Sequence, residues 1–290
     1  MSGPSELAWA AGLLVDAGLK ATVVLGIGWA GSQLLRGGSA SQRHALWALT
    51  LGALPLLPAL AAARGPSVAL DAPWLLAAWG IGVVVAASPW LRSLLALRRL
   101  TRDATPDPRD PRLRHSPTLS GPITWGFWQP VVLLPTRAAA WTPSARRAAL
   151  AHERAHIARH DWAVHGLAWL VCALFWFHPG VWLARRALAR EAEHAADDAV
   201  LAAGVRPSAY ASLLLAVARA GTPRAALGAS SSFVARRVQA LLGRRHRSAR
   251  RWPIAATALL LGALCLPALG AVPLWSASPQ TLTCQPGPLP

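Results

Sequence analysis

Four apolar stretches, each long enough to cross a lipid bilayer, most constrain what this chain can fold into. They cover residues 7–35, 44–63, 73–97 and 252–274. A helix needs about 20 apolar residues to cross the hydrocarbon core. Only helices and closed barrels satisfy all of their backbone hydrogen bonds there. The sequence therefore predicts a mainly α-helical integral membrane protein with four transmembrane helices.

The arginines predict the side of the membrane on which each connection lies. The chain has a formal net charge of +17, carried almost entirely by arginine. Because arginine-rich loops stay on the cytosolic side, we expect the 36–43 loop and the 98–251 region inside a bacterial inner membrane, with both termini outside. The basic run at 244–251 is expected to contact anionic lipid headgroups, and no direct nucleic acid binding is expected.

Residues 152–156 read His-Glu-Arg-Ala-His and predict a metal site. On a helix, His152 and His156 share one face and can bind the same ion. Glu153 is placed to take a proton from an attacking water. A helix is expected because Thr142-Pro143 provides an N-cap residue followed by proline at the first helical position. The motif predicts a zinc metallopeptidase with one Zn²⁺ and Glu153 as the catalytic base.

The third ligand is expected about 40 residues downstream, where two of the four glutamates lie. A catalytic zinc site usually has three protein ligands and one open position. We expect Glu193 to be that ligand, because Asp197 lies one turn further along the same face and can orient a ligand histidine. Glu191 remains the alternative.

The apolar stretch 163–184 must fold back on itself if this site is to form. A single crossing would put His152 and Glu193 on opposite sides of the membrane. His178-Pro179-Gly180 offers a turn, so the sequence predicts a helical hairpin over about 162–190 that lies on or dips into the inner leaflet. Asp161 is expected to end the zinc helix, to cap the first arm and, like Asp197, to support the metal ligands.

A short β-hairpin is expected between the third apolar stretch and the metal motif. Residues 101–114 are rich in Pro, Asp and Arg and read as a solvated linker. The runs 124–127 and 131–134 favour strands on either side of Trp128-Gln129-Pro130. An exposed edge strand there would hold a peptide substrate by β-augmentation, formed by Thr124, Trp125, Gly126 and Phe127. A purely structural sheet that supports the zinc helix is the alternative.

A tetrahedral oxyanion would need a further hydrogen-bond donor besides the metal. The histidines near the motif in sequence are candidates for this role, namely His160, His165 and His178. Packing within the protein is the alternative role for each of them.

Several segments together resemble a known family. They are QRHALWAL at 42–49, SGPITWGFWQPVVLLP at 120–135, LAHERAHIARHDW at 150–162, LFWFHPGVWLARRALAREAEHAADDAVL at 174–201 and YASLLLAVA at 210–218. Over about residues 1–275 the chain resembles the membrane-embedded zinc metallopeptidases of the BlaR/MecR antirepressor type.

The resemblance implies a gluzincin-like site with His152, His156 and Glu193 as ligands and Glu153 as base. It implies a cytosolic protease domain at 101–251, inserted between the third and fourth transmembrane helices. It also implies a protein substrate that is a DNA-binding repressor of the penicillinase-repressor type. Regulated proteolysis in transmembrane signalling is the function that follows.

The chain departs from this family in its outer region. Family sensors carry a large penicillin-binding domain after the last span, whereas only a short outer tail is expected here at 275–290. That sensor chemistry needs Ser-x-x-Lys, and the sole lysine, Lys20, has Ala17 three residues before it. We therefore expect no β-lactam receptor of that kind.

Three other functions fit parts of the sequence. One is an HtpX-like quality-control protease with the same chemistry and broader substrates. Another is an inactive membrane scaffold that zinc stabilises, which the intact Glu153 disfavours. A metal transporter would need ionisable residues in several spans, and spans two to four have hardly any.

Overall fold

The computed structural model describes residues 6–64, 72–221 and 227–243. Within these ranges the chain is mainly helical, with one small mixed sheet. The predicted fourth span at 252–274, the basic run at 244–251 and the tail at 275–290 lie outside the described residues.

Three candidate membrane spans are present, at Glu6–Gly37, Ala40–Ala62 and Trp74–Asp103. Helix α1 (Glu6–Leu34), which runs into η1 (Leu35–Gly37), forms the first, and α4 (Pro73–Asp103) forms the third. The described residues therefore contain three stretches that are long and apolar enough to cross a bilayer.

The second candidate span consists of two helices rather than one. Helix α2 covers Ala40–Ala53 and α3 covers Leu56–Arg64. Pro55 separates them, because proline has no backbone N–H to continue the helical hydrogen bonds. The sequence predicted a single stretch at 44–63 and did not anticipate this break.

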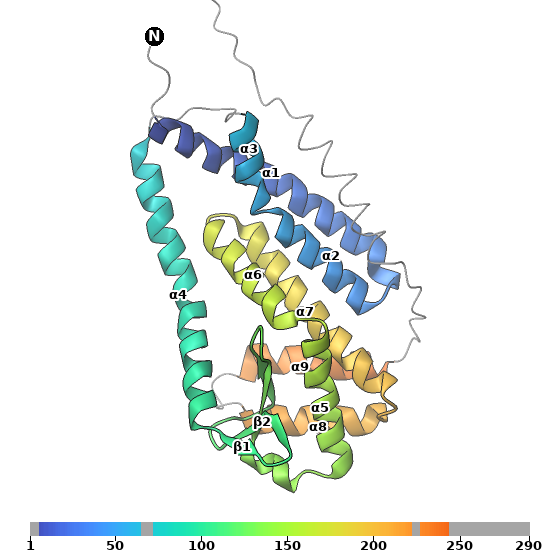
Figure 1. The fold of residues 1–290 in the computed structure, drawn as a ribbon. Coiled ribbons are helices and arrows are strands. Elements are labelled where there is room, and N and C mark those ends of the chain that lie inside the picture. The colour runs from blue at the N-terminus through green and yellow to red at the C-terminus, as the bar shows by residue number, and fades with distance from the viewer. Residues whose placement is uncertain (1–5, 65–71, 222–226, 244–290) are drawn as a thin grey trace, which may run out of the picture.

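The helices are arranged so that α4 stands along one side and α1 and α2 along the other, with α6 (Asp161–Leu174) and α7 (Pro179–Ala202) between them (Figure 1). The main apolar core lies between α1, α2, α3, α6 and α7. Its buried members include Leu25, Trp47, Leu51, Val171 and Leu188. Helices α6 and α7 are thus held inside the bundle.

Helices α6 and α7 form the hairpin that the sequence predicts. At 1.5 Å per residue the 14 residues of α6 reach about 21 Å, which is short of the roughly 30 Å hydrocarbon core. The chain turns at Phe175–His178, and the His178 side chain caps α7 by accepting a hydrogen bond from the Gly180 N–H at 3.1 Å. Helix α7 then runs back beside α5.

Tryptophan side chains connect this turn to α4 by hydrogen bonds. The Trp79 Nε1–H donates to the Leu174 carbonyl at 2.8 Å, and the Trp176 Nε1–H donates to the Trp79 carbonyl at 3.2 Å. These bonds satisfy the polar ends of large aromatic side chains in an otherwise apolar region. They fix the far end of the hairpin relative to the third span.

A four-stranded sheet lies below the bundle, in the order β1-β2-β4-β3. Its strands are β1 (Thr105–Asp107), β2 (Asp110–Ser116), β3 (Ile123–Trp125) and β4 (Val131–Pro135). Strands β2 and β4 pair in parallel, and the other two pairs are antiparallel. Strand β3 is therefore an edge of the sheet.

The expectation of a solvated linker at 101–114 was wrong, because this segment completes α4 and forms β1 and most of β2. Leu113 packs against Val132 and Leu134 of β4 in a small apolar cluster. The Asp107 and Asp110 carboxylates accept backbone N–H groups at the β1–β2 turn. Tertiary contact, rather than local composition, makes this segment a strand pair.

The predicted β3–β4 hairpin is present, with Thr124 opposite Val132 and Trp125 opposite Val131. Strand β3 ends at Trp125 because Gly126 has a φ of 111°, which glycine tolerates best. Gly126 and Phe127, which were expected in the strand, therefore lie in the turn after it.

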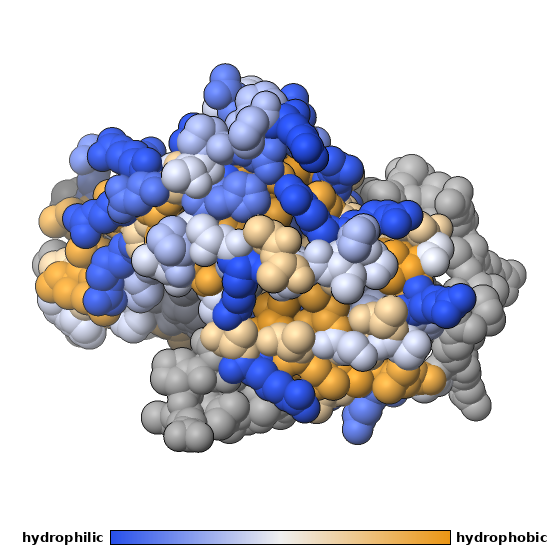
Figure 2. Space-filling model, turned by 90° about the horizontal axis from the view of Figure 1, so that it is seen from below, coloured by the Kyte–Doolittle hydropathy of each residue, from blue (hydrophilic) through white to orange (hydrophobic). Residues whose placement is uncertain are grey.

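The remaining elements surround the sheet at the same end of the molecule. They are η2 (Thr136–Ala140), α5 (Pro143–Ala158), α8 (Pro207–Gly221) and α9 (Leu227–Leu242). Seen from this end, hydrophilic side chains cover much of the surface, with apolar side chains between them (Figure 2). This end therefore differs from the apolar helices α1–α4.

The packing of α1 against α2 depends on the absence of a side chain at Gly28. A Cβ there would lie 2.6 Å from both Oγ1 and Cγ2 of Thr50, whereas a Cβ at Gly26 meets nothing within 4 Å. We expect Gly28→Leu to destabilise the protein by about 1–3 kcal/mol through overpacking and to lower its midpoint of thermal unfolding in detergent. Gly26→Leu, on the same helix, is the control, and equal effects of the two variants would contradict this packing.

Candidate metal centre

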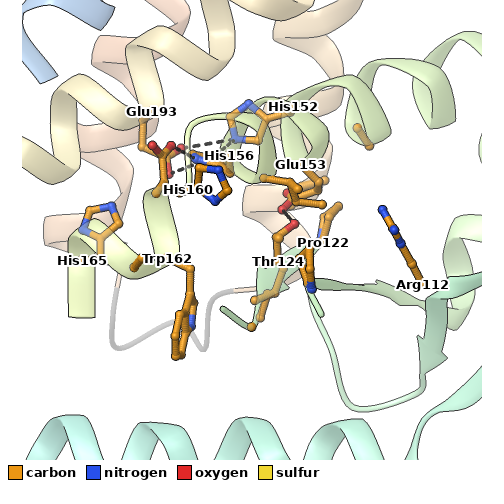
Figure 3. A pocket seen from close by; sticks show the side chains of 18 of the residues that line it. Arg112, Pro122, Thr124, His152, Glu153, His156, His160, Trp162, His165 and Glu193 are labelled. Atoms are coloured by element: carbon orange, nitrogen blue, oxygen red, sulfur yellow. Dashed lines mark hydrogen bonds and ion pairs between the residues drawn. The ribbon is translucent and has the colours of Figure 1, made fainter. Parts of the chain in front are cut away.

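Two histidines from α5 and one carboxylate from α7 point at a common position (Figure 3). The Nε2 atoms of His152 and His156 are 3.2 Å apart. Glu193 places Oε2 at 3.5 Å from His152 Nε2 and Oε1 at 3.7 Å from His156 Nε2. The structure thus brings together the three residues that the sequence predicts as ligands.

This spacing fits a zinc ion. Ligand atoms at roughly 2.0–2.1 Å from a tetrahedral zinc are separated by roughly 3.3–3.5 Å, close to the distances observed between the three side chains. All three ligand atoms lie within 4.8 Å of one another. Two imidazoles and a carboxylate are also a donor set that catalytic zinc sites use.

Asp161 orients His156 through the ring nitrogen that does not face the other two ligands. The His156 Nδ1 lies 2.7 Å from Asp161 Oδ2, which leaves Nε2 for the metal. Arg159 Nη2 donates to the same carboxylate oxygen at 2.5 Å and to the Ala192 carbonyl on α7 at 3.0 Å. Burial opposes ionisation of Asp161, but its hydrogen bonds to His156 and Arg159 lower the pKa of the carboxyl.

Asp161 does not cap α6 as expected. Helix α5 ends at Ala158, and the chain reverses at His160, whose φ is 54°. His160 occupies the N-cap position, and Asp161 is the first residue of α6. The carboxylate turns towards His156 and Arg159 instead, because both offer charge-assisted hydrogen bonds.

A second network orients His152. The Tyr210 hydroxyl, from α8, lies 2.9 Å from His152 Nδ1 and donates to Asp197 Oδ1 at 2.7 Å. Arg237, from α9, donates to both oxygens of Asp197 through Nε and Nη2, and its Nη1 is 2.7 Å from Glu193 Oε2. One buried guanidinium thereby joins the third ligand to the carboxylate behind the first.

The ionisation of these groups affects metal binding in opposite ways at Glu193 and at His152. Burial alone would raise the pKa of Glu193, but His152 and Arg237 lower it to about 2. Burial and the neighbouring Asp197 raise the pKa of Tyr210, so its hydroxyl keeps its proton. For His152, the hydrogen bonds with Asp197 and Glu193 outweigh burial and raise the pKa to about 9 without a metal. A proton therefore competes with a metal ion at His152.

Glu191, the alternative third ligand, binds an arginine of α2 instead. Its Oε2 accepts a hydrogen bond from Arg43 Nε of α2 at 2.8 Å, and Glu191 does not line the cavity of the metal centre. The same helix α7 thus presents Glu193 to the two histidines and Glu191 to α2. This arrangement favours Glu193 over the alternative.

Glu153 is buried beside the edge strand of the sheet. Its Oε2 accepts a hydrogen bond from Thr124 Oγ1 of β3 at 2.6 Å (Figure 3). Trp125, the next residue of β3, donates its Nε1–H to Thr101 Oγ1 of α4 at 2.8 Å. The edge strand is therefore fixed between the candidate base and the third span.

A cavity of about 640 Å³ opens over these groups. His152, Glu153, His156 and Glu193 line it on one side and β3 lines it on another. His160 and His165 also line it, and burial lowers the pKa of His165, so it is a neutral donor. His178 does not line this cavity and contacts Thr22 Oγ1 at 3.0 Å instead.

Sequence reasoning missed Tyr210, Arg159 and Arg237. Tyr210 is the sole tyrosine of the chain and opens the segment YASLLLAVA, which was noted only as part of a resemblance. The two arginines carried no signal, since they lie among 29 basic residues that the membrane topology already explained.

Comparison with known proteins identifies the family. A model of the BlaR1 peptidase M56 family matches residues 71–241, which is more than half of the chain. The chain belongs to this peptidase family. It is also similar to the regulatory protein BlaR1 of Bacillus licheniformis, with 32% identity over 89 residues. That segment covers 31% of this chain and 15% of the relative.

The Tyr210 hydroxyl gives a direct test of the network behind His152. We expect Tyr210→Phe to weaken zinc binding by about 10- to 100-fold, because the hydroxyl fixes the tautomer and orientation of the imidazole. Competition with a chelator measures this affinity. Ser212→Ala on the same helix, which removes an exposed hydroxyl bonded only to the Ser208 carbonyl, is the control. Unchanged affinity in Tyr210→Phe would argue against the network.

Proposed function

We propose that this protein is a membrane-bound zinc metalloendopeptidase that cleaves a protein substrate at the cytosolic face. The observation that carries the proposal is the convergence of His152, His156 and Glu193, with Glu153 beside them in the same cavity. Membership of the BlaR1 peptidase M56 family supports it. A structural zinc site would not need the buried base.

The residues of the chain have separate roles in this reaction. When bound, zinc would supply a Lewis acid and lower the pKa of water in the site. Glu153 takes the proton from the attacking water and passes it towards the leaving amine. Thr124 holds the Glu153 carboxylate by donating to Oε2, which keeps the other oxygen free for the proton.

Strand β3 is the proposed binding site of the substrate. It forms the edge of the sheet among the described residues, and Thr124 and Trp125 of this strand lie at the cavity or beside it. A peptide that adds to this edge as a further strand would run past Glu153. His160 and His165, which line the same cavity, are the proposed donors to the developing oxyanion.

We further propose that the substrate is a DNA-binding transcriptional repressor, so that cleavage transmits a signal across the membrane. The similarity to a regulatory protein supports a signalling role. Co-expression with a DNA-binding repressor of the penicillinase-repressor type tests this step. Specific cleavage of that repressor is expected, whereas indiscriminate cleavage of unfolded membrane proteins would point to quality control.

Two substitutions separate the base from the ligands. We expect Glu153→Gln to lower peptide hydrolysis by the purified full-length protein by about 10²- to 10⁴-fold while it keeps its zinc. Glu193→Ala should lose both zinc and activity, because only two protein ligands remain. Zinc content and peptide hydrolysis are measured on the same preparations.

The controls for these variants are the neighbouring side chains. Arg154, next to Glu153, is exposed, and His194, next to Glu193, lies outside the cavity of the metal centre. Arg154→Gln and His194→Ala should therefore keep both zinc and activity. Peptide hydrolysis at the wild-type rate by Glu153→Gln would remove Glu153 from its role, and an inactive wild type with bound zinc would favour the scaffold.

A further inference from the structure

Three buried polar residues lie at the start of α2, outside the cavity of the metal centre. Gln42, Arg43 and His44 have exposed fractions of 5%, 7% and 5% although they begin a candidate membrane span. Burying polar groups is costly unless other groups pair with them. Gln42 caps its own helix by accepting the Ser39 N–H. The groups nearest to the other two lie on α6 and α7, close to the metal centre.

His44 lies behind the carboxylate that orients a metal ligand. Its Nε2 is 3.5 Å from Asp161 Oδ1, and among the described residues this buried nitrogen has no hydrogen-bond partner. The other oxygen of the same carboxylate is 2.7 Å from His156 Nδ1. One carboxylate thus separates an imidazole on the second span from an imidazole of the metal centre.

Arg43 contacts the helix that presents the third ligand. Its Nε donates to Glu191 Oε2 at 2.8 Å, two residues before Glu193 on α7. Its Nη1 donates to the Gly38 carbonyl at 2.8 Å and to the Leu35 carbonyl at 3.3 Å. The guanidinium therefore joins the turn between the first two spans to α7.

We propose that His44 is a positioning residue of the metal centre, acting through Asp161 on His156, and that α2 supports the centre with Arg43 as a second anchor. The inference rests on the proposed metal site. The second candidate span then supports two of the three ligands, His156 through Asp161 and Glu193 through helix α7. A displacement of α2 is therefore expected to change the affinity for the metal.

The groups around the Asp161 carboxylate explain how His44 affects the orientation of His156. Arg159 approaches Oδ2 at 2.5 Å and Oδ1 at 3.3 Å, so it pulls the carboxylate towards itself. His44 Nε2 lies 3.5 Å from Oδ1, so the His44 ring also borders this oxygen. Without His44, the carboxylate is free to turn towards Arg159 and away from the geometry that holds His156.

Zinc affinity of the purified full-length protein tests the proposal without any substrate. We expect His44→Leu to raise the dissociation constant for zinc by about threefold to tenfold, less than the roughly 10- to 100-fold typical of groups that contact a ligand directly. His44→Gln, which keeps a donor near the position of Nε2, should bind zinc nearly as the wild type does. His44→Asn, whose amide is too short, should behave as His44→Leu.

Thr50→Val provides the matched control. Thr50 is buried on the same helix, and within the described part of the chain its hydroxyl bonds to the Leu46 carbonyl alone, so the variant should keep wild-type affinity. Wild-type affinity in both His44→Leu and His44→Asn would overturn the proposal. Equal losses in Thr50→Val and His44→Leu would also overturn it, because they would show a general effect of disturbing α2.

The absorption spectrum of the cobalt-substituted protein gives a second readout. A change in the ligand-field bands is expected for His44→Leu and not for His44→Gln or Thr50→Val, because only the first alters the orientation of a ligand. If the wild-type protein binds neither zinc nor cobalt, the proposed function itself fails. If it binds them and the His44 variants do not differ from it, only the coupling through α2 fails.

Discussion

The metal centre depends on one reversal of the chain. His152 and His156 belong to α5, and Glu193 reaches them only because α6 and α7 fold back on each other at Phe175–His178. The apolar core between α1, α2 and this hairpin holds the two arms in place. Helix α6 is too short to cross a bilayer by itself, so the reversal keeps all three side chains on one side.

Charge pairing then sets the details of the site. Four carboxylates near the metal position have a basic partner: Glu193 and Asp197 share Arg237, Asp161 has Arg159, and Glu191 has Arg43. Buried charges are tolerated only when they are paired and hydrogen-bonded. Because the three arginines come from α9, the turn after α5 and α2, the ligands are fixed by the tertiary structure and not by α5 and α7 alone.

The sequence predicted the parts of this arrangement that follow from local periodicity. The spacing of His152 and His156, the cap at Thr142 and the turn before Pro179 all act within a few residues. Helix periodicity also put Glu193 and Asp197 on one face of α7. The structure has both side chains near His152, Glu193 at its Nε2 and Asp197 at its Nδ1.

Long-range contacts were beyond sequence reasoning. The segment of β1 and β2 was predicted as a linker because it is rich in Pro, Asp and Arg. Leu113 is the one buried apolar residue of these two strands. Tyr210 and Arg237 lie 58 and 44 residues from the ligands that they contact, and no local pattern connects such distant positions. Likewise, Arg43 was counted with the cytosolic loop at 36–43 and His44 with the apolar stretch at 44–63, and neither position indicated a contact with α7 or α6.

X-ray absorption spectroscopy at the zinc edge, on the purified full-length protein, tests directly whether α5 and α7 bind one ion together. We expect one zinc per chain with two imidazole nitrogens at about 2.0–2.1 Å, carboxylate and water oxygens, and no sulfur. Glu193→Ala should lose one oxygen ligand or the metal itself. Protein without bound zinc, or zinc whose coordination is unchanged in Glu193→Ala, would contradict the meeting of α5 and α7 around one ion.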